Sequence, residues 1–351
     1  MLSQEEQKRY SKQTILPEIG IQGQEQLAAA KVLVIGAGGL GCPILQYLTA
    51  AGIGTIGIMD GDSVDISNLQ RQVLYTEQEI GQSKVLVAEK KLKALNPNVT
   101  INTYPVFINS GNALAIISEY DIVVDGSDNF ATRYLVNDAC VMLDKPLVSG
   151  AIYKFEGQVT VLNYQNGPTY RCLFQEPPQE GESPNCADIG VIATLPGIIG
   201  TIQANEVIKM ITGIGDVLSG KFLVIDTLSM NSRIFHFKLN EANKHIQSLQ
   251  DIPQLCETTS FTIDHDDMLR MMAEQTNIQL VDVREPDEHE IGNFGGMNIP
   301  LSHFHTARGM LDAANPVIVY CASGARSKHA AKLLLEKGFK YVYNLKKGYL
   351  Q

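Results

Sequence analysis

The stretch KVLVIGAGGLGCPILQYLTAAGIGTIGIMD, residues 31–60, decides the fold. It opens with a short run of valine, leucine and isoleucine, which is typical of a buried strand. A glycine-rich turn follows at 36–41, then a helical stretch that ends near Gly52, and then a second apolar strand. This strand, helix, strand unit predicts the start of a parallel, doubly wound α/β sheet.

The same alternation continues downstream. The expected elements are helices near 83–95 and 111–119 and strands near 99–106 and 121–128. Later segments are typical of hairpins instead, and they flank a helix; they cover 151–163 and 221–239, with the helix at 196–213. The sheet is therefore predicted to be Rossmann-like and mixed.

A second, smaller α/β unit follows a linker. Periodicity weakens and polar residues dominate over 241–260, as in a domain linker. Strand and helix patterns resume afterwards and fill about 90 residues, the size of a small domain. We assign residues 1–240 to the first domain and 261–351 to the second.

Composition limits the partners. The chain is 44% hydrophobic and 19% charged, as in ordinary globular proteins, and its formal net charge is −10. Nucleic acids and anionic membranes require a positive surface, so neither is expected as a partner. The sequence has no apolar run long enough to span a membrane, and its amino-terminal residues are polar, so we expect a cytoplasmic protein.

The glycine-rich turn predicts a nucleotide site. Gly36, Gly38, Gly39 and Gly41 allow the backbone to approach phosphates and direct helix amides at them. Asp60 ends the next strand, where an acidic residue accepts hydrogen bonds from ribose hydroxyls. At this point an NAD-dependent oxidoreductase fits as well as an ATP-using enzyme.

Further polar residues favour triphosphate chemistry. Arg71 and Lys84 could neutralise the β- and γ-phosphates as pyrophosphate leaves, and Asn68 could hold a phosphate oxygen or a water on the metal. Asp128 lies in a loop after a strand and is a natural magnesium ligand. Hydride transfer needs none of these groups, so ATP with Mg²⁺ is the expected pair.

The motifs GAGGLG, DGDSVDISNLQRQ, GQSK, DGSDNFATR and LVSGA together resemble the MoeB/ThiF adenylyltransferases, relatives of ubiquitin-activating enzymes. The resemblance covers residues 5–240 and implies binding of ATP and magnesium. The positions that match the family motif are Asp60, Ser67, Asn68, Arg71, Lys84 and Asp128.

The family also implies a homodimer, because an arginine near the amino terminus enters the site of the neighbouring subunit. Arg9 matches that arginine, whereas Lys12 replaces a second one and lacks its bidentate geometry. Many relatives bind zinc through two CxxC pairs. Here Thr169 replaces the first cysteine, Cys172 remains alone, and no CxxC follows residue 220, so we expect no structural zinc.

Two further cysteines are candidates for sulfur chemistry. Cys186 matches the position of a mobile loop cysteine in relatives and could exchange thiols, or it could be a bystander. Cys321 ends the apolar strand PVIVY and begins the loop CASGAR, whose small residues allow amides to surround a thiolate or persulfide. Arg326 closes this loop with a positive charge.

The second domain resembles the rhodanese-like domains, with LVDVREPDEHEIGNFGGMNIPL as the upstream signature. Tyrosine phosphatases place five residues between cysteine and arginine, whereas four lie here, and the narrower loop favours sulfur. Asp282 and Arg284 at the end of the preceding strand are expected to be structural.

The predicted reaction is ATP-dependent adenylylation of the C-terminal glycine of a ubiquitin-like sulfur carrier ending in Gly-Gly, as in molybdopterin or thiamine biosynthesis. A Cys321 persulfide, loaded by a donor such as a cysteine desulfurase, then supplies sulfur. The predicted catalytic residues are Arg71, Lys84, Asp128, Cys186, Cys321 and Arg326. An adenylyltransferase for an RNA base or metabolite, an NAD-dependent oxidoreductase and a non-catalytic scaffold remain as alternatives.

Overall fold

A computed structural model describes residues 2–177, 190–250, 261–274, 277–304, 309–346 and 348–349. The chain forms two compact units, which divide between residues 254 and 255. Within these ranges, no helix has both the length and the apolar character needed to cross a membrane.

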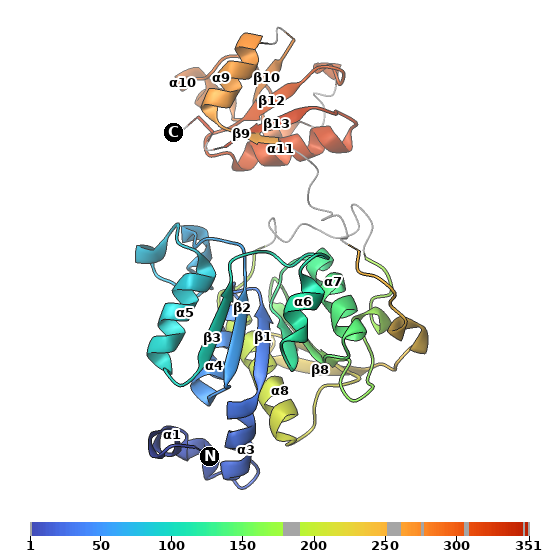
Figure 1. Ribbon diagram of the computed structural model, residues 1–351. Coiled ribbons are helices and arrows are strands. Elements are labelled where there is room, and N and C mark those ends of the chain that lie inside the picture. Colours follow the sequence, from blue (N-terminus) through green and yellow to red (C-terminus); the bar gives the residue numbers. More distant parts are fainter. Residues whose placement is uncertain are drawn as a thin grey trace. The chain divides into compact units, whose positions relative to one another are not determined.

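The first unit is built on an eight-stranded sheet with the order β3-β2-β1-β4-β5-β6-β7-β8 (Figure 1). Its strands are β1 (Lys31–Ile35), β2 (Thr55–Met59), β3 (Thr100–Tyr104), β4 (Ile122–Asp125), β5 (Leu147–Tyr153), β6 (Glu156–Leu162), β7 (Lys221–Asp226) and β8 (Asn231–His236). The first five strands are parallel, and the last three continue the sheet as antiparallel neighbours. The mixed, doubly wound sheet predicted from the sequence is confirmed.

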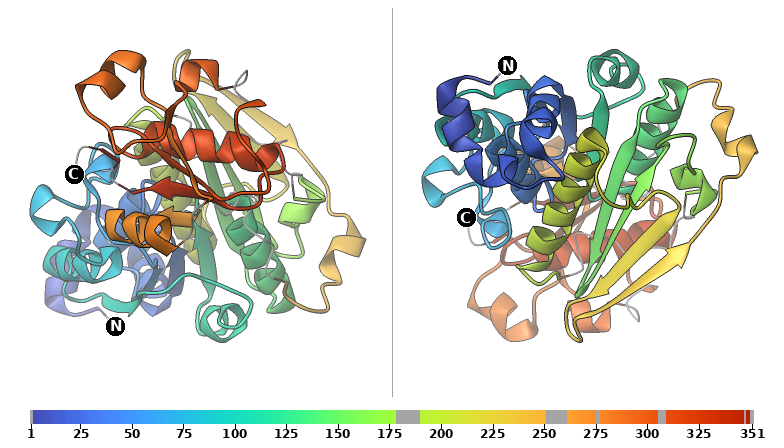
Figure 2. Two further views of the ribbon diagram at one scale, coloured as in Figure 1. Left: turned by 90° about the horizontal axis from the view of Figure 1, so that it is seen from above. Right: turned by 90° about the horizontal axis from the view of Figure 1, so that it is seen from below.

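Helices cover both faces of this sheet (Figure 2). The helices of this unit are α1 (Gln4–Arg9), α2 (Ser11–Thr14), α3 (Gly20–Ala29), α4 (Gly41–Ala51), α5 (Lys84–Leu95), α6 (Ala113–Ser118), α7 (Phe130–Met142) and α8 (Leu195–Thr212). Helices α4, α5 and α8 share a core with one face of the sheet, and α6 and α7 share a core with the other. The sheet is therefore the middle of three layers.

Alternation along β1 explains this layering. Val32 and Val34 pack in the core beneath α4 and α8, whereas Leu33 and Ile35 pack in the core beneath α6 and α7. All four are at most 3% exposed. Because successive side chains of a strand point to opposite faces, a strand buried on both sides needs a continuous apolar run, as residues 32–35 provide.

Local signals set the helix ends that position the site. Gly52 ends α4 with φ +85° and Gly213 ends α8 with φ +71°, the left-handed conformation that glycine adopts without strain. The Asn129 side chain caps α7 by accepting a hydrogen bond from the Thr132 amide. The three amino-terminal helices were not predicted, because their short segments show no clear apolar period.

The second unit holds a five-stranded sheet with the order β11-β10-β12-β13-β9, whose neighbours are all parallel. Its strands are β9 (Phe261–Ile263), β10 (Gln279–Asp282), β11 (Met297–Asn298), β12 (Val317–Tyr320) and β13 (Val342–Leu345), and its helices are α9 (His265–Glu274), α10 (Pro286–Ile291) and α11 (Ala325–Glu336). Buried Val317–Tyr320 form its central strand, which places Cys321 at a carboxyl end of this sheet.

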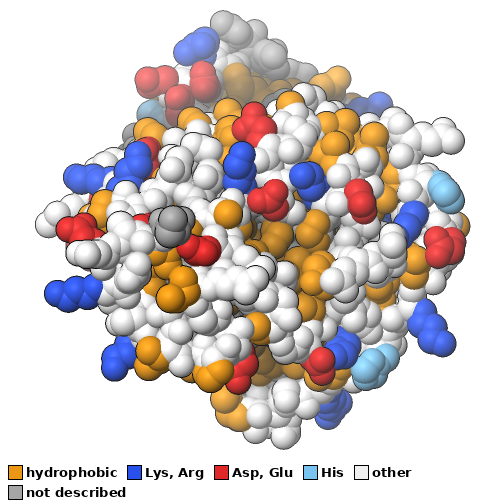
Figure 3. Space-filling view, turned by 60° about the horizontal axis from the view of Figure 1, so that its bottom comes forward, with side chains coloured by type: hydrophobic (Ala, Val, Ile, Leu, Met, Phe, Trp, Pro, Cys, Tyr) orange, Lys and Arg blue, Asp and Glu red, His pale blue; other side chains and the backbone are white. Residues whose placement is uncertain are grey.

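Surface charge is mixed. On the face in Figure 3, acidic and basic side chains alternate around a middle region where apolar side chains gather. The described residues on this face form no continuous basic surface, which nucleic-acid binding requires.

Candidate functional site

The glycine-rich turn lies where β1 meets the amino-terminal end of α4. The Gly36 amide bonds to the Met59 carbonyl of β2, and a Cβ at Gly36 would lie 2.8 Å from the Gly126 carbonyl oxygen after β4. A Cβ at Gly41 would overlap the carbonyl of Gly36. Only glycine allows this approach, so the turn sits at the carboxyl ends of three strands, the usual ligand site of such sheets.

The other glycines open the turn toward α8 and Arg71. A Cβ at Gly39 would lie 3.2 Å from Pro196 of α8 and 3.6 Å from the Arg71 Cδ atom. A Cβ at Gly38 would lie 3.5 Å from the Nε2 atom of the Gln72 side chain. Arg71 is therefore next to the predicted phosphate loop, although the two are 30 residues apart in the sequence.

Asp60 anchors the turn. One carboxylate oxygen accepts a hydrogen bond from the Ala37 amide at 2.7 Å, and the other accepts one from the Asp62 amide at 2.8 Å. The side chain is buried, at 8% exposure. Each oxygen retains further lone-pair capacity for a ribose hydroxyl. This anchoring of the loop was not predicted from the sequence.

Lys84 is the first residue of α5 and forms an ion pair with Asp62 at 2.9 Å. Its side chain is 5% exposed, whereas that of Asp62 is 56% exposed. A cation at a helix amino terminus opposes the helix dipole, and a buried ammonium group also loses hydration. Asp62 offsets both costs and holds the ammonium group in place, and a polyphosphate that displaced the exposed Asp62 carboxylate would become the partner of Lys84.

The segment before Arg71 is held by short hydrogen bonds. Asp65 accepts bonds from the amide and the hydroxyl of Ser67, at 2.8 and 2.6 Å. The Arg71 guanidinium donates to the Ser67 carbonyl at 3.1 Å, and the Asn68 carbonyl accepts from the Arg71 amide at 3.0 Å. Ser67, Asn68 and Arg71 thus form one short turn beside the loop.

Several buried polar atoms near the glycine-rich turn and the loop after β4 have no hydrogen-bond partner among the described residues. They are Gln72 Oε1, Asp125 Oδ2, Ser127 Oγ and Arg133 Nε. Buried polar groups are normally hydrogen-bonded, so these atoms are suited to a ligand or bound water. The sequence reasoning missed them, although Asp125, Ser127 and Arg133 all belong to or follow the DGSD segment that drew attention to Asp128.

Asp125 is the most buried of these groups. Burial raises the pKa of this carboxyl, and the positive charge of Arg133 opposes that rise. Its other oxygen accepts a hydrogen bond from the Ser127 amide at 2.9 Å. A carboxyl held in this way retains its proton in the folded chain at pH values where an unfolded chain has lost it.

Replacing Asp125 by asparagine should therefore change the pH dependence of stability. With a raised folded-state pKa, the wild-type chain loses stability as the pH rises above the ordinary value of 3.8. The asparagine variant lacks that loss, which has a limiting slope of about 1.4 kcal/mol per pH unit. Calorimetry from pH 4 to 7 checks this, with exposed Asp144→Asn as control; parallel curves for wild type and Asp125→Asn would contradict it.

Asp128, the predicted magnesium ligand, is exposed in the loop before α7 and makes no hydrogen bond or ion pair with the described residues. The described residues contain no group of three or more His, Cys, Asp or Glu that could hold a metal by themselves. Mg²⁺ beside a nucleotide is usually held by one or two carboxylates together with phosphates and water. A single open carboxylate fits that mode.

Arg9 lies at the other end of the sheet. Its guanidinium donates to the Leu95 carbonyl at the end of α5, at 3.1 Å. Residue 95 precedes β3, at the amino-terminal edge of the parallel strands, whereas the glycine-rich turn is at their carboxyl edge. Within one chain, Arg9 is therefore not part of the nucleotide site.

Cys172 is surrounded by hydrogen-bond donors. Its sulfur accepts from the Thr169 amide at 3.4 Å, the Asn240 amide at 3.3 Å and the Asn243 side chain at 3.6 Å. Burial raises the pKa of this thiol, but these hydrogen bonds outweigh it and bring the pKa below its ordinary value. Hydrogen bonds from residues 240 and 243 thus tie the segment after β8 to Cys172. Cys186 lies outside the described residues.

In the second unit, Cys321 is fully buried at the start of its loop. The Gly324 amide donates to its sulfur at 3.1 Å, and the Ser327 hydroxyl donates at 3.4 Å. Burial raises the pKa of Cys321, but the hydrogen bonds from Ser327, and those from the amides of residues 323 and 324, outweigh it and lower the pKa. The loop therefore favours a thiolate, the nucleophilic form.

Ser327 is predicted to sustain this reactivity. Replacing it with alanine removes the hydroxyl donor, raises the pKa of Cys321 toward its ordinary value and slows alkylation at pH 7 by about threefold or more. The pH profile of iodoacetamide labelling, followed by peptide mass spectrometry, measures this. Exposed Ser323→Ala leaves the hydroxyl donor intact and serves as control, and identical profiles for wild type and Ser327→Ala would contradict the role.

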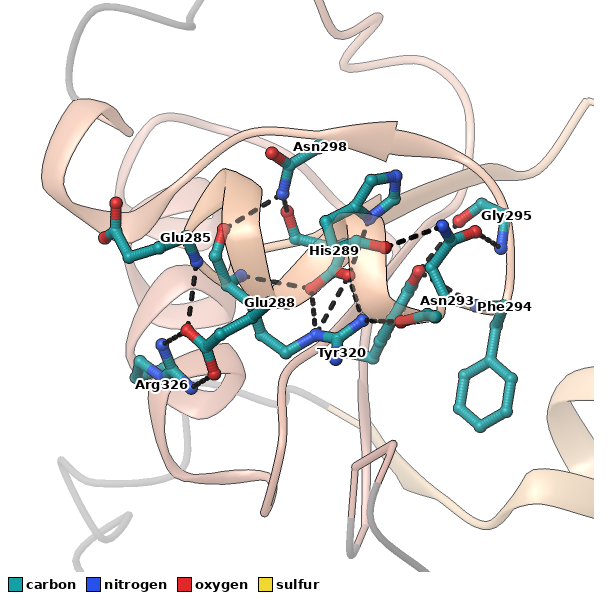
Figure 4. A network of polar contacts seen from close by, with 12 residues as sticks. Glu285, Glu288, His289, Asn293, Phe294, Gly295, Asn298, Tyr320 and Arg326 are labelled. Atoms are coloured by element: carbon teal, nitrogen blue, oxygen red, sulfur yellow. Dashed lines mark hydrogen bonds and ion pairs between the residues drawn. The ribbon is translucent and has the colours of Figure 1, made fainter.

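A polar network lies beside this loop (Figure 4). Buried Asp282 accepts hydrogen bonds from the Arg284 guanidinium at 2.6 to 3.0 Å and is 2.8 Å from His289 Nδ1. Arg284 also donates to the Gly292 carbonyl, and its guanidinium lies 4.5 Å from the Tyr349 ring. Asp282 and Arg284 thus join β10 to α10, the structural role that was predicted.

Arg326 does not point at a free anion site. Both of its terminal nitrogens donate to the Glu288 carboxylate of α10, each at 2.6 Å (Figure 4). The two side chains are 36% and 32% exposed. The sequence predicted a positive charge closing the loop, but that charge is paired, and Glu288 was not predicted.

The fold and these two loops define an enzyme class: a nucleotide-binding transferase unit joined to a transferase unit with a reactive thiol. The chain belongs to the ThiF family, whose model matches residues 10–248, and carries a rhodanese-like domain over residues 264–351. The predicted family resemblance is confirmed.

Similar proteins match both units of the chain in sequence. A probable adenylyltransferase/sulfurtransferase MoeZ of Mycobacterium tuberculosis is 39% identical over 99% of this chain and 93% of its own length. A sulfur carrier protein adenylyltransferase of Thermus thermophilus is 53% identical over 66% of this chain and 87% of its own. The chain is accordingly an adenylyltransferase with a sulfurtransferase domain, and an NAD-dependent oxidoreductase is no longer an alternative.

Solved structures match the fold of the first unit. Escherichia coli MccB, in a complex with MccA-N7isoASN, superimposes with a TM-score of 0.61 and 23% identity, covering 68% of this chain and 73% of MccB. At this identity the match supports the fold alone.

Proposed function

We propose that the chain uses ATP to adenylate the C-terminal glycine carboxylate of a small, ubiquitin-like sulfur-carrier protein, and then converts the product to a thiocarboxylate with sulfur from Cys321. The observation that carries the proposal is the thiol of Cys321, held by the Gly324 amide and the Ser327 hydroxyl, on the same chain as a ThiF nucleotide unit. A carrier substrate also accords with the name of the Thermus relative.

In the first step, a carboxylate oxygen of the carrier attacks the α-phosphorus of ATP. The bond from phosphorus to the bridging oxygen breaks, and pyrophosphate leaves with the electron pair. Arg71 and Lys84 neutralise its charge, and the turn amides hold the phosphates. A carboxylate is already ionised at neutral pH, so this step needs no general base.

Asp128, with the nucleotide phosphates, would hold the magnesium ion. When bound, the ion supplies charge neutralisation on the phosphate oxygens. Asp60 would hold the ribose, and Asn68 a phosphate oxygen or a water molecule. Arg9 would act from the neighbouring subunit of a homodimer, which accords with its distance from the site in its own chain.

In the second step, a persulfide on Cys321 attacks the acyl carbon, and AMP leaves with the electron pair. The carrier is then bound to Cys321 through an acyl disulfide. The Cys186 thiolate attacks the Cys321 sulfur, which releases the carrier thiocarboxylate and leaves a disulfide between the two cysteines. An external thiol reductant restores both thiols, and a donor such as a cysteine desulfurase reloads Cys321.

The test is exchange of labelled pyrophosphate into ATP with purified protein, magnesium and candidate carriers that end in Gly-Gly. Carrier-dependent exchange is the expected result, because adenylate formation is reversible while pyrophosphate is present. ATP binding without exchange for every carrier would overturn carrier activation and favour another adenylylated substrate, such as an RNA base or a metabolite.

A further inference from the structure

The loop of residues 321–326, called here the sulfur loop, contains a single cationic residue, and that residue already forms an ion pair with a carboxylate. Among residues 321–326, only Arg326 is basic. Glu288 accepts two hydrogen bonds from its guanidinium, each at 2.6 Å. Such bidentate pairs are stronger and better ordered than most surface ion pairs. The loop therefore presents a neutral pair beside its thiol.

Both partners keep their charges over the working range of pH. Hydrogen bonds from Arg326 lower the pKa of Glu288 to about 2, against a smaller opposing effect of burial. The Glu288 carboxylate, followed by the charges of Cys321 and Glu285, raises the pKa of Arg326 above its ordinary value. The pair therefore loses its neutrality only when the pH falls to about 2.

This arrangement bears on the choice of sulfur donor. Thiosulfate carries two negative charges, so its approach to a thiolate is repulsive unless a cation offsets that charge. A persulfide carried by a thiol places less charge at the sulfur that is transferred. Backbone amides and a hydroxyl, not Arg326, are the main groups that stabilise the Cys321 thiolate. The thiol thus remains reactive while the loop offers a small dianion little attraction.

We propose that Glu288 is a specificity-determining residue of the sulfurtransferase unit, which selects thiol-carried persulfides over thiosulfate by holding the Arg326 guanidinium. The inference rests on the proposed persulfide at Cys321.

Both donors transfer one sulfur atom to the Cys321 thiolate. With a persulfide, the Cys321 thiolate attacks the terminal sulfur, the donor S–S bond breaks, and the donor thiolate leaves with the electron pair. With thiosulfate, the thiolate attacks the outer sulfur and sulfite leaves with the electron pair. Each reaction produces one Cys321 persulfide, so the donors differ in the charge that the loop must accept.

The test compares Glu288→Gln with wild type in the full chain, with cyanide as acceptor and either thiosulfate or cysteine persulfide as donor. Glutamine keeps the shape of the side chain but removes the charge. We expect kcat/KM for thiosulfate to rise about tenfold, mainly through a lower KM, because one charge-assisted contact becomes available. We expect kcat/KM for the persulfide to change by less than about twofold.

Two variants separate this effect from a general change of charge. Glu285→Gln removes a neighbouring carboxylate but leaves the bidentate pair, so it should keep the wild-type preference. The double variant Glu288→Gln with Arg326→Gln removes the released cation, so it should lose the gain in thiosulfate activity that Glu288→Gln shows. An independent readout is iodoacetamide labelling of Cys321, whose pH midpoint should fall in Glu288→Gln and recover in the double variant.

Equal thiosulfate activity in wild type and Glu288→Gln, with both melting alike, would overturn the inference. So would a gain that persists in the double variant, since Arg326 would then not be its source. The Cys321→Ser variant separates failure of the proposed function from failure of the role inferred for Glu288. If Cys321→Ser retains transfer, the proposed function fails; if it loses transfer while Glu288→Gln behaves as wild type, only the role of Glu288 fails.

Discussion

Replacing Cys321 by serine is expected to abolish thiocarboxylate formation on the carrier while leaving carrier-dependent pyrophosphate exchange within about twofold of wild type. The serine hydroxyl has a similar shape but forms no persulfide, so sulfur can no longer be loaded. The loop hydrogen bonds from Gly324 and Ser327 can still be accepted by an oxygen. The loss is therefore chemical and confined to the second step.

Mass spectrometry of the carrier measures this outcome, since a thiocarboxylate replaces one oxygen by sulfur. Cys172→Ser is the control, because Cys172 is another free thiol with a lowered pKa, although it is partly exposed whereas Cys321 is buried. That variant should retain thiocarboxylate formation. Normal product from Cys321→Ser would show that sulfur reaches the acyl-adenylate by another route.

Replacing Lys84 by methionine is expected to lower pyrophosphate exchange by about 10²- to 10³-fold, the usual effect of removing one preorganised group that stabilises a transition state. Lys84 is 5% exposed, and its only ion pair among the described residues is with Asp62. Methionine fills the same space without the charge, so the variant leaves Asp62 at a largely exposed position and little of the fold is disturbed.

The control is Lys93→Met, on the same helix. Lys93 is 50% exposed and pairs with Glu89, one turn away on α5. Exposed pairs of this kind contribute little, so exchange should stay within about twofold of wild type. Equal exchange rates for the two methionine variants would show that Lys84 maintains structure and does not act on the phosphates. Thiosulfate activity of the Lys84 variant should be unchanged, which verifies an intact second unit.

The sequence predicted most of the fold because its strands are buried on both faces. A strand covered by helices on both sides requires consecutive apolar residues, and 32–35 and 122–124 have them. The elements that it missed include the short helices α1 and α2, the edge strand β11 and the 13-residue helix α7. Their burial depends on neighbours far along the chain, which no local pattern records.

The candidate residues were found where a motif is continuous in sequence. The turn at 36–41 and the loop at 321–326 each carry their own glycines, and both lie where a strand ends. Hydrogen bonds and ion pairs between segments far apart in the sequence were not predicted. Lys84 with Asp62, Arg326 with Glu288, and the bond from Ala37 to Asp60 join residues that no spacing rule relates.

The sequence alone determined the class of the chain: two α/β units, a phosphate-binding turn followed by basic residues, and a cysteine loop of sulfurtransferase length. The tertiary structure decided which charges are available. It left Asp128 open, paired the Arg326 charge with Glu288, and placed Arg9 at the far edge of the sheet. The physical reason is that residue type and local pattern determine which segments turn and which segments are buried. The net charge at a site depends instead on which distant side chains the fold brings within hydrogen-bonding distance.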